Sequence, residues 1–219
     1  RWLQVTRPRI SIPDLPSAFD GLCIGHLTDI HHGPYLSYAR VNEIVDLASQ
    51  LAPDLWVITG DLVYRSPKYI EPVWQALGRL KAPLGVWCVM GNHDHWEGIA
   101  LSRRAARAAG IACLDNDHTV LRCAGERLWL AGVGDRWCHD QRLPKALRGL
   151  PREAVALLLA HNPEVADDMT DPRVKLMLAG HTHGGQVALP LFGPLLVPGQ
   201  RRYASGLVRT QVSQVYVSR

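Results

Sequence analysis

The 219-residue sequence predicts an α/β fold in which two mixed β-sheets pack face to face with helices outside. Two patterns predict it. Short apolar runs alternate with helical patterns in the first half of the chain, which is typical of parallel strands joined by helical crossovers. A hairpin pattern and short β-branched segments dominate the second half. Hydrophobic residues make up 47% and charged residues 20% of the chain, the balance of an ordinary globular protein.

The first half contains three predicted strands, each followed by a helical pattern. In the first helix, apolar residues recur every three or four positions from Val41, and Ser37 precedes them as a candidate N-cap. The predicted elements are a strand at 22–27, a helix at 41–51, a strand at 55–58, a helix at 72–80, a strand at 85–90 and a helix at about 99–109.

The second half contains strands of another kind. Two apolar runs flank the turn Ala124-Gly125-Glu126, which indicates a β-hairpin. A helix is expected between the next two strands, and Gly, Pro and β-branched residues dominate from Gly184 onward. The expected strands are 120–123, 128–131, 155–160, 176–179 and 212–217.

The domain organisation follows from what the sequence lacks. No repeat, low-complexity tract or flexible linker interrupts it, so residues 1–219 are expected to form a single domain, with residues 1–20 partly an extension. The chain starts at Arg1 without a Met or a signal peptide. We therefore expect a chain that is truncated at both ends.

Composition narrows the class of protein. Five cysteines without a CxxC pair argue for a reducing, cytoplasmic setting. No apolar run reaches the roughly 18 residues needed to span a bilayer. The formal charge of +4 suits an anionic substrate or peripheral contact with the inner membrane face, although a solvated basic surface is the simpler interpretation. Nothing resembles a nucleic-acid-binding module.

Five polar clusters follow directly after apolar, strand-like runs. Because ligands bind at the carboxyl ends of strands in open α/β sheets, these clusters are expected to meet at one edge. Asp29 and His31 are two residues apart, so they point to the same side of an extended chain. The clusters are Thr28-Asp29-Ile30-His31-His32, Thr59-Gly60-Asp61, Gly91-Asn92-His93-Asp94-His95, His161-Asn162-Pro163 and Gly180-His181-Thr182-His183-Gly184-Gly185.

The clusters offer oxygen and nitrogen ligands without a thiolate. Carboxylates, an amide oxygen and imidazoles together suit ions such as Mn²⁺, Fe or Zn²⁺. A bridging carboxylate would hold two ions about 3.5–4 Å apart, the arrangement used for in-line displacement at phosphorus. A lone acid or histidine at a strand end is more often a turn or cap residue, so the five clusters together predict the dinuclear site. The candidate ligands are Asp29, His31, Asp61, Asn92, His161, His181 and His183.

The same blocks resemble those of the calcineurin-like metallophosphoesterase superfamily, and the likeness extends from about Leu22 to the end of the chain. The matching blocks are Asp29-x-His31, Gly60-Asp61, Gly91-Asn92-His93-Asp94, His161 and Gly180-His181-x-His183. The segments similar to its bacterial branch of YkuE- and YaeI-like phosphodiesterases are His161-Asn162-Pro163, His181-Thr182-His183-Gly184-Gly185-Gln186 and Tyr203-Ala204-Ser205-Gly206. The resemblance implies a four-layer α/β/β/α sandwich with the metal site at the carboxyl ends of the strands.

The resemblance also implies how the metal ions would be held. Two divalent transition metal ions are expected, with Mn²⁺ first and Fe, Zn²⁺, Co²⁺ or Ni²⁺ as alternatives. The implied ligands are Asp29, His31 and His183 for one ion and Asn92, His161 and His181 for the other, with Asp61 bridging.

A histidine that follows a ligand has an implied catalytic role. His93, oriented by Asp94, would act as a general acid or as a donor to a phosphate oxygen, and a metal-bridging hydroxide would attack phosphorus. Two departures from the family pattern stay open. His32 is interpreted as an exposed or supporting histidine rather than a third metal contact, and Tyr64 as a packing residue rather than an iron ligand.

Several side chains near the clusters are candidates for substrate binding, with surface packing as the alternative for each: Arg65, Lys68, Trp96 and Arg136. The apolar segment 187–197 follows the last cluster and would form either an acyl-chain or membrane-facing lip or a buried connection. The predicted substrate is a phosphorylated small molecule or a lipid-linked one. The alternatives to a general phosphoesterase are a UDP-diacylglucosamine-type pyrophosphatase and, in another class, a metal-binding scaffold without catalysis.

Overall fold

The computed structural model describes residues 3–185, 187–189, 193–196 and 199–218, the second and third of these ranges by their backbone alone. The first half forms a four-stranded sheet whose strands are all parallel, in the order β1-β2-β3-β4. Its strands are β1 (Ile24–Leu27), β2 (Leu55–Ile58), β3 (Val86–Cys88) and β4 (Ala112–Cys113). One sheet is therefore purely parallel rather than mixed, because each connection is a helical crossover.

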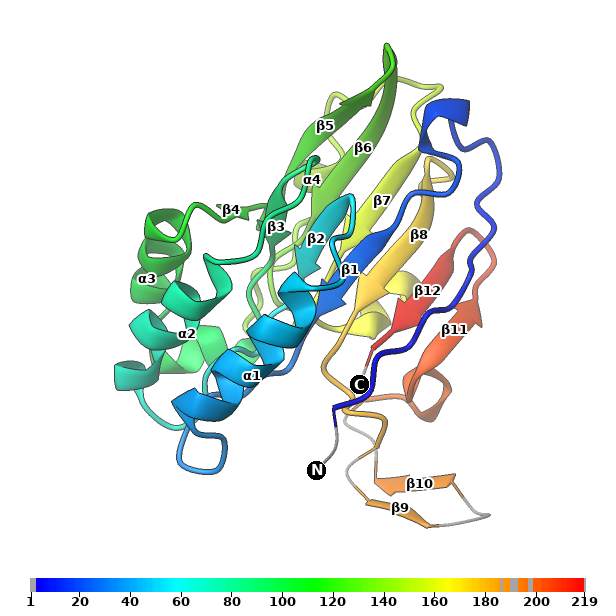
Figure 1. The fold of residues 1–219 in the computed structure, drawn as a ribbon. Coiled ribbons are helices and arrows are strands. Elements are labelled where there is room, and N and C mark those ends of the chain that lie inside the picture. Colours follow the sequence, from blue (N-terminus) through cyan, green and yellow to red (C-terminus); the bar gives the residue numbers. More distant parts are fainter. Residues whose placement is uncertain (1–2, 186, 190–192, 197–198, 219) are drawn as a thin grey trace.

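Three helices cover the outer face of this sheet (Figure 1). They are α1 (Tyr38–Ser49), α2 (Ile70–Leu77) and α3 (Asn92–Ala108). The Ser37 side chain caps α1 by accepting a hydrogen bond from the Arg40 backbone N–H, as predicted. Helix α3 begins at Asn92 instead of near 99, and Gly98, with φ 143° and ψ 80°, interrupts it. The first turn of α3 therefore carries the third polar cluster.

The second sheet is mixed and has six strands in the order β11-β12-β8-β7-β6-β5. Its strands are β5 (Asp117–Cys123), β6 (Glu126–Gly132), β7 (Ala156–Leu159), β8 (Val174–Ala179), β11 (Gly206–Arg209) and β12 (Gln214–Val217). The predicted hairpin is β5–β6, and its two loop residues, Ala124 and Gly125, both have positive φ, as a tight hairpin turn requires. A two-stranded hairpin, β9 (Val187–Leu189) with β10 (Gly193–Leu196), lies apart from both sheets.

Successive side chains along each strand point to opposite faces of the sheet, which separates the core into layers. Leu55 and Val57 of β2 point between the two sheets, whereas Trp56 and Ile58 point toward α1–α3. Leu157 and Leu159 of β7 also lie between the sheets, and each of these strand residues is fully or almost fully buried. At about 25 cal/mol per Å² of buried apolar surface, this central layer is a main source of stability.

The outer face of the six-stranded sheet is covered by short helical segments: α4 (Leu143–Ala146), η3 (Pro163–Asp167) and η4 (Arg201–Tyr203). The α/β/β/α prediction is confirmed, but the helix expected between β7 and β8 is only the five-residue 3₁₀ segment η3. Aspartates at its end oppose the helix dipole, and Pro172 favours an extended residue before it, so a longer helix is disfavoured.

The segment before β1 packs on the body of the protein. Phe19, in the 3₁₀ turn η1 (Ser17–Phe19), is buried between the sheets, and Glu126 accepts hydrogen bonds from Ser17 and Ala18. Across the described residues, no helix combines the length and apolar character needed to cross a membrane.

Candidate metal centre

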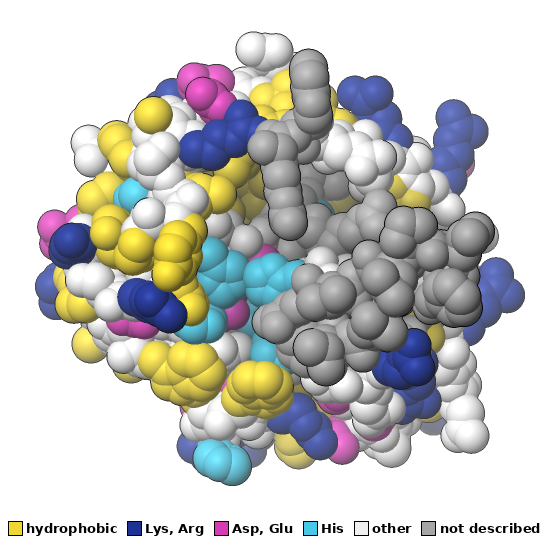
Figure 2. Space-filling model, turned by 90° about the horizontal axis from the view of Figure 1, so that it is seen from below, with side chains coloured by type: hydrophobic (Ala, Val, Ile, Leu, Met, Phe, Trp, Pro, Cys, Tyr) yellow, Lys and Arg dark blue, Asp and Glu magenta, His cyan; other side chains and the backbone are white. Residues whose placement is uncertain are grey.

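The loops after β1, β2, β3, β7 and β8 meet at one end of the two sheets, where the carboxyl ends of these strands lie. Figure 2 shows this face, with histidines gathered near its middle and acidic side chains visible between them. Three groups of ligand atoms occur here among the described residues, each group lying within 4.8 Å. They are Asp29–His31–His183, His31–Asp61–His93 and Asp61–His161–His181.

The backbone at the site is unusual. Five of the seven candidate ligands have left-handed backbone angles, with φ between 51° and 71°: Asp29, His31, Asp61, His181 and His183. Non-glycine residues rarely adopt this conformation, and it costs of order 1–3 kcal/mol per residue. The backbone N–H groups of Asp29 and His31 donate to the carbonyls of Gly60 and Asp61 at 2.9 and 3.0 Å, which links the first two loops. Concentrated strain of this kind is typical of functional sites.

Two glycines leave room for the ligands. A Cβ on Gly91 would lie 2.3 Å from the Asp61 Oδ1, and a Cβ on Gly180 would lie 2.3 Å from the Asp29 Oδ2. Any larger residue would displace these carboxylates, so the glycines beside the predicted ligands have a steric reason.

The first group places imidazole nitrogens beside a carboxylate. His31 Nε2 lies 3.1 Å from His183 Nε2, and His183 Nε2 lies 3.4 Å from Asp29 Oδ1. The Thr28 hydroxyl donates to Asp29 Oδ2 at 2.7 Å, and the His181 backbone N–H donates to the same oxygen at 2.9 Å. These bonds hold the Asp29 carboxylate with Oδ1 toward the two imidazoles.

The group Asp61–His161–His181 is deeply buried. His161 Nε2 lies 3.2 Å from Asp61 Oδ2 and 3.1 Å from His181 Nδ1. His161 Nδ1 lies 2.7 Å from the Thr59 carbonyl, to which it donates, so Nε2 is free to bind a cation. Asn92 Oδ1 is buried and has no hydrogen-bond partner among the described residues. A buried polar atom without a partner is costly, so this oxygen fits a metal ion. His181 faces the group through Nδ1.

Asp61 connects the group Asp29–His31–His183 to the group that contains His161 and His181. Its Oδ2 lies 3.6 Å from His31 Nε2 and 3.2 Å from His161 Nε2, and its Oδ1 accepts a hydrogen bond from the His93 backbone N–H at 2.9 Å. The carboxylate therefore faces nitrogens of both groups, which is the position that a bridging ligand requires.

The electrostatics of the site favour positive charge. Burial alone would lower the pKa of His161, but Asp61 and Asp29 outweigh it and raise that pKa to about 10. Burial and the charge of His161 instead lower the pKa of His181 to about 4. In the absence of metal, Asp61 and Asp29 therefore favour the protonated form of His161. A bound metal ion would supply the positive charge in place of that proton, and His161 would bind it as a neutral imidazole. The oxygen and nitrogen donors fit divalent transition metal ions.

No hydrogen bond joins Asp94 to His93 among the described residues, although the sequence predicts that Asp94 orients His93. Its carboxylate accepts three backbone hydrogen bonds, from Asp61 at 2.8 Å, Gly91 at 2.9 Å and Leu62 at 3.1 Å. His93 Nδ1 has no partner among the described residues. Adjacent helical residues point about 100° apart, so the two side chains diverge in the first turn of α3. Burial and Asp61 raise the pKa of Asp94 to about 7 despite these bonds.

His32 packs within the fold, and Tyr64 lies against the histidines of the centre. His32 is 4% exposed, bonds the Leu36 carbonyl through Nδ1 at 2.9 Å and packs against Tyr69. It belongs to none of the three ligand groups found among the described residues. The Tyr64 ring lies beside His93 and His31, with centroids 5.1 and 5.8 Å away.

The four candidate substrate-binding residues lie in different surroundings. The Arg65 guanidinium is exposed over Tyr35 and Tyr64, and the Trp96 ring packs on His93 at 4.8 Å. Lys68 instead lies over Tyr69, and Arg136 pairs with Asp168. Arg65 and Trp96 therefore lie beside the predicted centre. Lys68 and Arg136 instead contact side chains that are not candidate ligands.

Sequence reasoning did not assign a role to the supporting residues. Thr28 and Thr59 lie in the clusters themselves: Thr28 directly precedes Asp29, and Thr59 lies two residues before Asp61. Asp135 follows β6 as another carboxylate after a strand; it is fully buried, and its Oδ2 has no partner among the described residues. The strand-then-acid pattern that selected Asp29 and Asp61 could also have selected Asp135.

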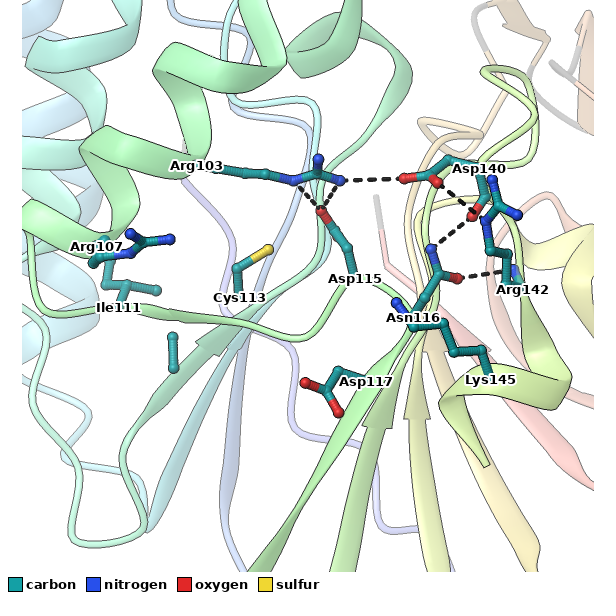
Figure 3. Close-up of a pocket in the computed structure, with 11 residues that line it drawn as sticks. Arg103, Arg107, Ile111, Cys113, Asp115, Asn116, Asp117, Asp140, Arg142 and Lys145 are labelled. Carbon is teal, nitrogen blue, oxygen red and sulfur yellow. Dashed lines mark hydrogen bonds and ion pairs between the residues drawn. The ribbon is translucent and has the colours of Figure 1, made fainter. Parts of the chain in front are cut away.

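A pocket of about 520 Å³ lies between α3 and the segment that leads into α4 (Figure 3). Arg103 donates to both Asp115 and Asp140 there. Asp115 also accepts from the Met90 backbone N–H at 3.0 Å, directly before Gly91. None of its lining residues is a candidate ligand. The link from this pocket to the site is Asp115, which holds the backbone between β3 and Gly91.

Comparison with known proteins identifies the family. The model of the calcineurin-like phosphoesterase family matches residues 23–185. The chain belongs to this family. It is therefore a metal-dependent phosphoester hydrolase, of a family that uses divalent metal ions and acts on phosphorylated substrates.

Similar proteins span most of the chain. It is 32% identical to the uncharacterized metallophosphoesterase YkuE of Bacillus subtilis, over 99% of this chain and 78% of YkuE. It is 31% identical to the phosphodiesterase YaeI of Escherichia coli, over 100% of this chain and 81% of YaeI. A zebrafish transmembrane protein with a metallophosphoesterase domain is 32% identical, but the match covers only 52% of that longer protein.

Solved structures agree on the fold. A 5′-nucleotidase precursor from Thermus thermophilus matches with a TM-score of 0.58 and 15% identity, over 90% of this chain and 48% of that one. The protein TT1561 from the same organism also gives a TM-score of 0.58, with 17% identity over 89% and 87% of the two chains.

Proposed function

We propose that this protein hydrolyses phosphodiester or phosphomonoester bonds at a centre of two divalent metal ions. The observation that carries the proposal is the position of Asp61, whose carboxylate faces His31 in one group of candidate ligands and His161 in the other. Family membership supports the reaction class. When bound, the two ions would supply an activated water as the nucleophile and neutralise charge on the phosphoryl oxygens.

The proposed ligand sets are those expected from the family resemblance: Asp29, His31 and His183 for one ion, Asn92, His161 and His181 for the other, and Asp61 between them. The short distances within each set support this division, and so does the unpartnered Asn92 Oδ1. Mn²⁺ is the proposed ion, with Fe, Zn²⁺, Co²⁺ and Ni²⁺ as alternatives.

His93 is the proposed proton donor. Its backbone N–H bonds the bridging carboxylate of Asp61, and its ring lies 4.9 Å from that of His31. His93 belongs to the group His31–Asp61–His93 but is left out of the proposed ligand sets. Because it is half-buried beside the proposed ligands, it can reach a leaving oxygen or a phosphoryl oxygen. Asp94 acts by shaping the loops on which Asp61 and Gly91 lie.

The proposed substrate is a phosphorylated small molecule in the cytoplasm. A narrower candidate is pyrophosphate cleavage in a lipid precursor of the UDP-diacylglucosamine type, at the inner membrane face. The feature that favours it is the apolar segment 187–197, which lies partly outside the described residues, and no described side chain belongs to it. Comparing hydrolysis of bis-p-nitrophenyl phosphate with that of a UDP-linked lipid separates the two substrates.

The test of the proposed function is the His93→Ala variant. We expect metal content equal to that of the wild type and turnover of bis-p-nitrophenyl phosphate reduced by at least about 10²-fold. The matched control is His139→Ala, which removes an exposed histidine outside the three ligand groups. A metal-loaded wild-type protein that hydrolyses no phosphoester would favour the scaffold alternative. Full activity in His93→Ala would remove the role proposed for His93.

A further inference from the structure

Two exposed tryptophans border the proposed metal centre. Trp96 is 58% exposed and Trp137 is 47% exposed. Each packs nearly perpendicular to a histidine of the centre. The ring centroids of Trp96 and His93 are 4.8 Å apart, and those of Trp137 and His181 are 4.3 Å apart. About half of each indole thus stays open to solvent directly beside the predicted reacting groups.

Both indoles stand on rigid supports. Trp96 lies in the first turns of α3, whose start is fixed by the hydrogen bonds to Asp94. Trp137 lies in the loop after β6, where Asp135 accepts hydrogen bonds from the backbone N–H groups of Cys138 and Asp140 at 2.8 and 2.9 Å. A side chain that is held in place yet left exposed loses little entropy when a ligand packs on it.

The surroundings of Trp96 are also aromatic. The ring centroids of Tyr64 and His93 are 5.1 Å apart, and those of Tyr35 and Tyr64 are 6.2 Å apart. Tyr35 is 79% exposed. The Arg65 guanidinium lies over both tyrosine rings. Figure 2 shows hydrophobic side chains beside the histidines on this face. Aromatic rings with a neighbouring guanidinium suit a planar, π-rich group that is attached to an anion.

We propose that Trp96 and Trp137 form a subsite for a planar aromatic group, such as a nucleobase or an aryl ring, that the substrate carries on its phosphate. This inference rests on the proposed function. His93 is the proposed donor to the leaving oxygen, so Trp96 beside it assigns the aromatic group to the leaving side of the scissile bond. The subsite would make the protein select phosphoesters of aromatic-bearing alcohols over those of small alkyl alcohols.

The test is the binding of phenylphosphonate and methylphosphonate to the metal-loaded protein, measured by calorimetry. Both compounds have a stable carbon–phosphorus bond, so binding is read without turnover. We expect phenylphosphonate to bind about tenfold more tightly than methylphosphonate, a typical gain from stacking. The ratio should fall toward one in Trp96→Ala and Trp137→Ala and persist in the two Trp→Phe variants. The control is Leu207→Ala, an exposed apolar residue on the edge strand β11.

Three results would overturn the subsite. The first is the absence of any difference between the two phosphonates in the wild type. The second is a ratio that survives both alanine variants. The third is binding to anionic lipid vesicles that depends on the tryptophans while the phosphonate ratio does not, which would assign the indoles to a membrane surface. An inactive protein that still prefers phenylphosphonate would contradict the proposed hydrolysis but keep the subsite.

Discussion

Replacing Asp94 with alanine should destabilise the protein far more than it impairs proton transfer. The Asp94 carboxylate is fully buried and accepts backbone hydrogen bonds from Asp61, Leu62 and Gly91. Removing it leaves three buried N–H groups without a partner, at about 1–3 kcal/mol each. After allowance for relaxation and entry of water, we expect the free energy of unfolding to fall by about 3–5 kcal/mol. The melting temperature should fall by about 10 °C.

The assay is urea and thermal denaturation followed by circular dichroism, with metal content measured on the same samples. Asp94→Asn keeps one carbonyl acceptor and should lose about half as much stability. The control is Asp46→Ala, which removes an exposed carboxylate paired with Arg79 and should change stability by less than about 1 kcal/mol. An Asp94→Ala protein of wild-type stability that loses turnover as His93→Ala does would refute this reasoning and restore the orienting role.

Three further predictions concern the ligands and one surface pair. Asp61→Ala should lose both metal ions because its carboxylate faces both groups, whereas His181→Ala should lose one; elemental analysis distinguishes them. Gly91→Ala places a Cβ 2.3 Å from the Asp61 Oδ1, so metal titration should show affinity reduced by about tenfold or more, and unchanged affinity would contradict the steric argument. Hydrogen bonds from Arg173 lower the pKa of Asp171, so this pair stabilises the fold above the unfolded-state pKa of about 3.9 and loses its effect as the pH falls through the folded-state pKa. Both side chains are 22% exposed, so Asp171→Asn should cost under about 1 kcal/mol at pH 7 in urea denaturation. That difference should shrink below pH 4, and a constant difference would contradict the assignment.

The positions of the candidate ligands could be predicted because two simple signals coincide there. Buried strands such as Leu55–Ile58 are continuous apolar runs, and the chain turns polar where each strand ends. Glycine accompanies several of these turns, and at Gly91 the structure supplies the reason, which is the close approach of Asp61. Parallel strands then bring the turns to one edge without further information.

Other features depend on contacts that the sequence does not reveal. The first turn of α3 is polar, from Asn92 to His95, so no apolar period marks its start. The bonds from Asp94 to the loop after β2 join residues more than 30 positions apart. The left-handed backbone of Asp29 and His31 is accompanied by bonds to the neighbouring loop. Asp and His adopt this conformation more often than most residues, but still too rarely for the sequence to predict it.

The measurement that tests the central claim most directly is the metal content of the untreated protein, paired with hydrolysis of bis-p-nitrophenyl phosphate before and after chelation. We predict about two transition metal ions per chain, activity lost on chelation, and activity restored by Mn²⁺. A protein that binds no metal ion, or one whose hydrolysis is unaffected by chelation, would contradict the dinuclear centre.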